Sequence, residues 1–432
     1  MKGNYWEGGG DRRRETMTAA ALALLCLVVY GKTTCPGSFW QDAGIYVRAA
    51  YLLGNCYPPG YPTYLPLGSL FSALPGVGPT GGINLLSAVA GAAATFFCAL
   101  TAWRLAPSAA VAPVAAATST LLLIAAPGVW AQATAAEVYT LNLALTVATL
   151  WVLIVWRDAG DDRFLWAAVF IYGLAGGVHP QQIVFLPIYV GYVIWAGRGR
   201  RYGASVWFFA AAVFILACSV YLYLPLRSAR GIYPDWGHTK TLPAFMNHLT
   251  GQQYRGDLFT ASPAMMAARL RAAGALLGEQ FPWIALGAAA LGTVWLWGRK
   301  TRAAFLIFGA AGLAVAFIIN YYSANWRTYY LPLYLALALG AGTAAAFLTS
   351  VVIKRRSKWG VGVAAVVTLA AAAPLFGRWG PGDRSRSDFA DKSAANVLRS
   401  VGPRATFILS YEGSAVTGPM ATLVTTSWAR PD

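Results

Sequence analysis

Residues 204–226 read ASVWFFAAAVFILACSVYLYLPL, a run without a single Asp, Glu, Lys or Arg. An α-helix of this length rises about 34 Å, enough to cross the hydrocarbon core of a bilayer, which is roughly 30 Å thick. The run follows the basic cluster at 198–201 and ends at Arg227. This segment predicts a membrane-spanning helix, and the same pattern recurs along the chain.

The whole chain shares the composition of this segment. Of its 432 residues, 57% are hydrophobic and 11% are charged, whereas a soluble domain is about a quarter charged. This excludes a soluble enzyme and a disordered chain, and the long apolar runs are unlike the alternating strands of a porin-type barrel. The net charge of +17 does not indicate nucleic-acid binding, because the basic residues lie in short clusters between apolar runs. The sequence predicts an all-α polytopic membrane protein.

Eleven apolar segments are expected to cross the membrane, the first as a retained helix rather than a cleaved signal peptide. The basic clusters between them are 12–14, 104, 157–163, 198–201, 299–302 and 354–358, all on one side. The positive-inside rule then places the N-terminus in the cytoplasm, and the loops 32–81 and 227–279 and the C-terminal tail outside. The composition favours a prokaryotic plasma membrane. The expected spans are 16–31, 82–103, 107–126, 137–156, 164–179, 181–197, 204–226, 280–298, 303–320, 329–350 and 359–376.

We expect two parts, a membrane domain over 1–376 and an external tail over 377–432. The tail opens with a linker-like stretch at 377–382 and a polar segment at 387–399 that predicts a short helix. Strand-like runs at 404–411 and 421–428 suggest the start of a truncated soluble domain.

For two features of the long external loops, the sequence is consistent with two alternatives each. Helical spacing over 242–249 and 263–277 predicts helices that lie on the outer leaflet or pack as ordinary loop helices. Cys35 and Cys56 share the first external loop, where they form a disulfide or remain two free thiols.

Asp42 is the sole acid of the loop 32–81. A carboxylate at a membrane–water boundary can take the proton of an acceptor hydroxyl. Asp42 also precedes a helical stretch at 43–53, as a helix N-cap does. Both roles are consistent with the sequence.

Other polar groups stand near expected external ends of spans. Residues 57–64, YPPGYPTY, predict a rigid turn whose tyrosines offer hydroxyls and ring faces to a sugar, or a structural turn into the next helix. Glu137 begins one expected span and His179 ends another. Because ionisable groups next to a membrane are costly, we expect a site on this face.

Short motifs follow one another over about residues 35–335, each weak alone but specific as an ordered set. They are Asp42-Ala43-Gly44, Pro58-Pro59-Gly60-Tyr61-Pro62, Asn84-Leu85-Leu86-Ser87, Glu137-Val138-Tyr139 with Leu141-Asn142, Gly173-Leu174 with His179, Tyr223-Leu224-Pro225-Leu226-Arg227, Trp236-Gly237, Gln253-Tyr254 and Tyr330-Leu331-Pro332. This set resembles the GT-C-type membrane glycosyltransferases of a family first catalogued as a domain of unknown function, whose animal member is a transmembrane protein O-mannosyltransferase.

The resemblance implies a GT-C-like fold of about eleven transmembrane helices and an inverting glycosyltransferase. A mannose-like hexose would pass from a polyprenyl-phosphate carrier to a protein or glycan hydroxyl on the external face, with Asp42 as general base. A phosphate leaving group needs cations nearby. The external arginines nearest the expected spans can supply this positive charge, or they can anchor the protein to lipid headgroups. These arginines are Arg227, Arg327 and Arg255. The resemblance also implies residues that bind the sugar or the acceptor, or that orient the base. These are Glu137, His179, Tyr57, Tyr61, Tyr139 and Trp236.

Two positions depart from the family pattern. Tyr57 stands where the family usually has a His before Pro-Pro-Gly, and Ile45 stands where it often has a Glu. The sequence has no Asp-x-Asp or His-x-x-x-His cluster, so we expect a site without metal or cofactor, although a divalent ion bound by Asp42, Glu137 and His179 stays open. A transporter or lipid flippase and a catalytically degenerate GT-C scaffold are the alternatives.

Overall fold

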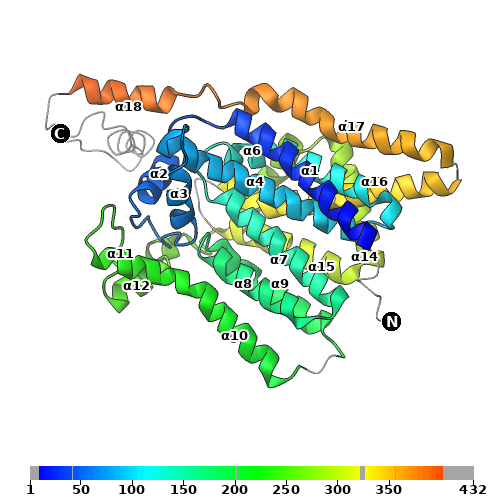
Figure 1. Cartoon of the computed structure of the whole chain (residues 1–432), viewed down its shortest axis with the longest axis horizontal. Coiled ribbons are helices and arrows are strands. Elements are labelled where there is room, and N and C mark those ends of the chain that lie inside the picture. Colours follow the sequence, from blue (N-terminus) through cyan, green and yellow to red (C-terminus); the bar gives the residue numbers. More distant parts are fainter. Residues whose placement is uncertain (1–8, 41, 200–201, 322–325, 356, 402–432) are drawn as a thin grey trace.

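The structure, a computed structural model, describes residues 9–40, 42–199, 202–321, 326–355 and 357–401. Over these ranges the chain forms helices and no strand, with two isolated bridges that pair Asn55 with Asp235 and Leu258 with Tyr321. Figure 1 shows long helices lying side by side and short helices gathered at one end. The all-α class is therefore confirmed, while the expected strands at 404–411 and 421–428 lie outside the described residues.

The helices follow in chain order, with η marking 3-10 helices. They are α1 Gly9–Thr33, α2 Ala43–Tyr51, α3 Tyr64–Ser72, α4 Gly78–Leu105, η1 Ala109–Val111, α5 Ala112–Ala125, α6 Pro127–Ala133, α7 Tyr139–Ala159, α8 Asp162–Gly176, α9 Gln181–Ala196, α10 Ala204–Cys218, η2 Ser219–Leu222, α11 Tyr223–Ala229, α12 Leu242–Leu249, η3 Gln252–Asp257, α13 Pro263–Gln280, α14 Trp283–Arg299, α15 Thr301–Asn320, η4 Trp326–Tyr330, α16 Leu331–Arg355, α17 Ser357–Gly382 and α18 Phe389–Ser400.

Among the described residues, seven helices are long and apolar enough to cross a membrane, and two bent helix pairs raise the number to nine. The pair at Ala109–Ala125 and Pro127–Ala133 bends by 71°, and the pair formed by α13 and α14 bends by 110°. In both pairs a proline stands at the break, where it removes a backbone donor. Each of the eleven predicted segments contains a helix, but α8 and α9 have 15 and 16 residues. At about 1.5 Å per residue these two are too short to cross the core alone.

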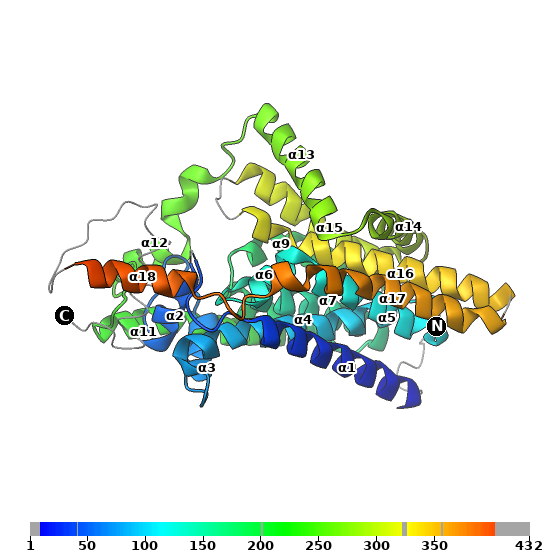
Figure 2. The same ribbon diagram turned by 90° about the horizontal axis from the view of Figure 1, so that it is seen from above.

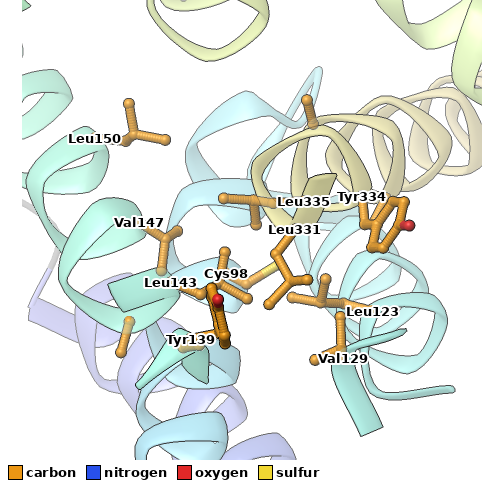
Figure 3. Close-up of a cluster of buried hydrophobic side chains, with 14 of the residues drawn as sticks. Cys98, Leu123, Val129, Tyr139, Leu143, Val147, Leu150, Leu331, Tyr334 and Leu335 are labelled. Atoms are coloured by element: carbon orange, nitrogen blue, oxygen red, sulfur yellow. The ribbon is translucent and has the colours of Figure 1, made fainter. Parts of the chain in front are cut away.

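The core lies where α4, α5, α6, α7 and α16 meet. Figure 3 shows its apolar side chains converging from these helices, among them Cys98, Leu123, Val147 and Leu335. Small residues also let α14 and α16 approach closely, since a Cβ on Gly292 would lie 1.8 Å from the Gly340 carbonyl oxygen. The outer helices instead expose large apolar side chains, as expected of surfaces that face lipid.

The predicted basic loops meet at one end of the bundle. Arg104 at the end of α4 pairs with Glu15 of α1 at 3.2 Å, and the Lys300 Nζ donates to the Arg104 carbonyl oxygen. Figure 2 shows the start of α1 and the α16–α17 hairpin at this end, and α2, α11, α12 and α18 at the other. The two sides inferred from the charge clusters are thus the two ends of the fold, and which of them faces outward stays a prediction.

The first part of the tail differs from its prediction. Residues 377–382 form the last turns of α17 instead of a linker, because α17 continues to Gly382. The short helix expected over 387–399 is confirmed as α18. Asp391 of α18 accepts from the Ser38 backbone N–H at 3.1 and 3.2 Å, and the Phe389 and Trp40 rings lie 5.1 Å apart. Helix α18 therefore packs on the loop that leads to Asp42.

The helices predicted within the loop 227–279 are present as α12 and α13. Figure 2 shows α13 projecting from the body of the molecule. Whether these helices lie on a leaflet stays a prediction.

Candidate active site

Asp42 stands directly before α2, yet its side chain makes no capping hydrogen bond to that helix. Its Oδ2 instead accepts a hydrogen bond from the Tyr57 hydroxyl at 3.0 Å. Burial raises the pKa of the Asp42 carboxyl, and the hydrogen bond from Tyr57 acts in the opposite direction by stabilising the carboxylate. The Asp42 side chain is therefore held by Tyr57 and does not cap α2.

Tyr57 belongs to a cluster of tyrosines that fills the space between α2 and the turn before α3. Its hydroxyl also bonds that of Tyr46. The rings of Tyr57 and Tyr46 each pack edge-on against Tyr61, with centroid distances of 5.3 and 5.2 Å. Tyr46 lies four residues after Asp42, so both face the same side of α2. The cluster fixes the hydroxyl that reaches Asp42.

Glu137 lies in the connection before α7 and is close enough to Asp42 for their charges to interact. Burial raises the pKa of Glu137 well above its ordinary value, the Asp42 carboxylate raises it further, and the Arg384 guanidinium lowers it. Its Oε2 atom is buried without a hydrogen-bond partner in the described part of the chain. A protonated Glu137 could donate one hydrogen bond into the site.

His179 lies buried in the connection between α8 and α9, next to two aromatic rings. Its ring centroid is 5.2 Å from that of Tyr139 and 5.3 Å from that of Tyr329. The Gln181 backbone N–H donates to His179 Nδ1 at 3.1 Å, and burial lowers the pKa of His179 to about 3. A neutral imidazole at this place suits packing or hydrogen bonding better than binding an anion.

The three predicted phosphate-binding arginines lie in different surroundings. Arg227 donates from Nε to the Leu53 carbonyl oxygen at 2.6 Å and from Nη2 to that of Leu52 at 3.3 Å, just after α2 ends. Arg327 pairs with Glu279 at 3.0 Å in an exposed position. Arg255 is exposed and donates to the Thr250 hydroxyl at 3.0 Å. Of these, Arg227 is the one fixed to the short helix that Asp42 begins.

Trp236 is half exposed, and its ring lies 6.3 Å from that of Tyr57. Tyr57, Tyr61 and Trp236 thus come together next to Asp42, whereas the Tyr139 ring packs at a tilt against His179. Within the described ranges no three His, Cys, Asp or Glu side chains form a metal-binding group. The expectation of a metal-free site stays a prediction.

Cys35 and Cys56, the two cysteines of the loop 32–81, are free, buried thiols in the structure. The Cys35 Sγ donates to the Ser387 carbonyl oxygen at 3.2 Å, while Cys56 lies near Asp42. The disulfide left open by the sequence is therefore absent, because each thiol packs against a different part of the fold.

Sequence reasoning missed two residues near the site. The Arg384 Nη1 donates to the Ala131 carbonyl oxygen at 2.7 Å, its guanidinium lies 3.9 Å over the Phe39 ring, and its charge reaches Glu137. No local pattern could reveal a contact between the tail and residues so early in the chain. Tyr46 could have been found, since its spacing from Asp42 is one helical turn.

Residues 42–201 match the sequence model of a family described as the Protein O-mannosyl-transferase TMEM260 N-terminal domain. The predicted resemblance is confirmed. The chain is 26% identical over 260 residues to "Protein O-mannosyl-transferase tmem260" of Dictyostelium discoideum and 28% identical over 258 residues to that of Mus musculus. These alignments cover 55% and 58% of this chain and 31% and 35% of the relatives. The chain thus matches about a third of the length of each relative.

Solved structures support the fold. The crystal structure of ArnT from Cupriavidus metallidurans bound to undecaprenyl phosphate superposes with a TM-score of 0.62 at 15% identity, covering 95% of this chain and 88% of that one. The Archaeoglobus fulgidus oligosaccharyltransferase superposes with a TM-score of 0.56 at 12% identity, covering 93% and 63%. Both neighbours are GT-C enzymes, so the predicted GT-C-like fold is confirmed.

Proposed function

We propose that this protein is an integral-membrane glycosyltransferase that moves a mannose-like hexose from a polyprenyl-phosphate carrier to a protein or glycan hydroxyl, with inversion and on the external face. The observation that carries the proposal is the Asp42 carboxylate. This carboxylate accepts a 3.0 Å hydrogen bond from Tyr57. It does not cap α2, although it stands directly before that helix.

In the proposed reaction, Asp42 removes the proton of the acceptor hydroxyl as that oxygen bonds to C1 of the hexose. The bond between C1 and the phosphate oxygen breaks on the opposite side of the ring, and its electron pair leaves with the polyprenyl phosphate. The product has the opposite anomeric configuration. The Tyr57 hydroxyl orients the carboxylate, in the place where the family usually carries a histidine.

The leaving phosphate requires positive charge. Arg227 is our first choice, because its guanidinium is fixed at the C-terminal end of α2, one short helix away from Asp42. Arg327 and Arg255 are further choices, and both are exposed and thus accessible to a lipid phosphate.

The comparisons support the two substrates in general terms. The structural neighbour was crystallised with undecaprenyl phosphate, and the relatives are named protein O-mannosyl-transferases. We infer a polyprenyl-phosphate-linked sugar as donor and a protein hydroxyl as the first acceptor to test.

The test uses the purified full chain in liposomes with radiolabelled polyprenyl-phosphate mannose, glucose in a parallel sample, and a peptide rich in serine and threonine. We expect label in the peptide, with the anomer opposite to that of the donor. Movement of the lipid between leaflets without label in any acceptor would instead identify a flippase. A folded protein that produces neither result with either sugar would support the scaffold.

A further inference from the structure

A cavity of about 410 Å³ opens beside the tyrosine cluster and has no role in the reaction described above. It is formed where α12 and η3 of the loop 227–279 meet the turn before α3. Its polar walls are the side chains of Asn247, His248, Gln252 and Gln253. Cavities of roughly 300–1,000 Å³ typically bind small ligands.

His248 is the least exposed polar group of this cavity, at 3% of its surface. The Cys56 backbone approaches the ring, but neither ring nitrogen completes a hydrogen bond in the described structure. Both ring nitrogens are covered, so the imidazole forms part of the cavity wall.

Two glycines make room for this imidazole. At Gly60, where φ is +93°, a Cβ would lie 3.0 Å from His248 Nε2, and at Gly237, where φ is +78°, a Cβ would lie 2.2 Å from His248 Nδ1. Both backbone angles also disfavour any residue with a side chain. Gly60 of the Pro-Pro-Gly motif and Gly237 of the Trp-Gly motif therefore pack directly against the His248 ring.

The chemistry of the cavity is neutral and rich in hydrogen-bonding groups. Among the described residues that line it, none carries a full charge, so a phosphate would find no counter-charge there. Three carboxamides supply both donors and acceptors, and Trp236, which precedes the lining residue Gly237, is a half-exposed aromatic residue beside the cavity. A hexose presents the matching set of hydroxyls and an apolar face.

The cavity also adjoins the candidate base. Its wall residue Pro58 follows Tyr57, whose hydroxyl donates to Asp42, and the Trp236 ring packs on the Tyr57 ring at 6.3 Å. A sugar in the cavity would therefore lie next to the groups that hold the base.

We propose that the cavity lined by Asn247, His248, Gln252 and Gln253 is a binding subsite for one neutral hexose unit. The inference builds on the proposed function and specifies where it recognises sugar. The hexose comes from one of two sources, the donor lipid or a glycan acceptor.

Binding is measured first, without turnover. Saturation-transfer NMR records contact between methyl mannoside and the purified full chain. We expect the signal to be lost in Gln252→Ala combined with Gln253→Ala, and in Ala244→Phe, which fills the cavity from α12. Asn320→Ala is the matched control, because its amide donates to Ala316 of its own helix, away from the cavity. Unchanged signals in both cavity variants would overturn the proposal.

Kinetics then identify the source of the hexose. If it belongs to the donor, the cavity variants raise KM for the sugar lipid about tenfold, the size expected from one or two lost hydrogen bonds, and leave KM for a peptide acceptor unchanged. If it belongs to a glycan acceptor, KM for that glycan rises instead. A rise confined to the peptide KM, with mannoside binding intact, would contradict a hexose subsite.

The two measurements separate this proposal from the proposed function. Mannoside binding that depends on the cavity, in a protein without transfer, would preserve the subsite and reject the transferase. Transfer that is unchanged in the cavity variants would support the transferase and reject the subsite.

Discussion

At the scale of single residues, the site depends on what holds Asp42. From the sequence, Asp42 could serve as a base or as an N-cap, and its position directly before a helix on its own favours the N-cap. The structure separates them, because the Asp42 side chain bonds Tyr57 and not the backbone of α2. That partner could not be deduced from spacing, because it lies beyond the end of α2, in a turn whose path depends on packing.

The Tyr57 hydroxyl should set the pH dependence of transfer. Its hydrogen bond lowers the pKa of Asp42 against the larger effect of burial, which raises it. Tyr57→Phe removes the lowering contribution, so the pKa of Asp42 rises and the base is protonated at higher pH. We expect the acid limb of the kcat/KM profile to move to higher pH, measured with the radiolabelled donor. An unmoved limb would mean that Tyr57 does not act on the base.

The cysteines give a second prediction at this scale. Cys35 and Cys56 are buried, free thiols with different neighbours. Thiol labelling of denatured, unreduced protein should modify both, and mass spectrometry of the peptides reads out each one. A disulfide-linked peptide that contains both residues would contradict the described packing.

At the scale of elements, apolar runs predicted the helices well, because a lipid-facing or buried helix must be apolar along its length. They did not predict the bends between α5 and α6 or between α13 and α14, which depend on how the prolines are packed. The expected linker at 377–382 failed for a related reason. Pro374 and Pro381 lie inside α17, and the Arg378 guanidinium fastens this helix to the Ala125 and Gln280 carbonyl oxygens.

Arg227 links an element to the site. Its two hydrogen bonds hold the carbonyl groups after α2, and hydrogen bonds from charged groups are worth about 1.5–3 kcal/mol each. Arg227→Ala should therefore lower the melting temperature by a few degrees and reduce kcat. If Arg227 also binds the donor phosphate, KM for the lipid donor rises as well. A change in donor KM with an unchanged melting temperature would contradict the structural role of Arg227.

At the scale of the whole molecule, the basic clusters predicted that the start of the chain, Arg104 and Lys300 lie at one end, and these three are found together. Glu15, Arg104 and Lys300 come from three separate segments and meet at one end. The contact of α18 with the first loop was not predicted, because residues more than three hundred positions apart share no local pattern. Convergence of Tyr57, Tyr61 and Trp236 beside Asp42 likewise depends on tertiary packing.

Sidedness can be tested with introduced cysteines in a Cys218→Ser background. Arg163→Cys lies in the basic α7–α8 connection, and Gln253→Cys lies at the opposite end beside the cavity; both positions are exposed. In intact cells, an impermeant thiol reagent should label Gln253→Cys but not Arg163→Cys. Arg163→Cys should be labelled only after the cells are opened. The reverse pattern would place the site in the cytoplasm.

The most direct measurement compares single-turnover transfer from polyprenyl-phosphate mannose by wild type, Asp42→Asn and Asp388→Asn. Asp388 is a matched control, an exposed acid at the same end of the molecule that pairs with Lys392. A general base contributes about 10²- to 10⁴-fold to the rate. We predict a loss of this size in Asp42→Asn at equal expression and melting temperature, and a near wild-type rate in Asp388→Asn. Transfer by Asp42→Asn at the wild-type rate would contradict the assignment of Asp42 as the base.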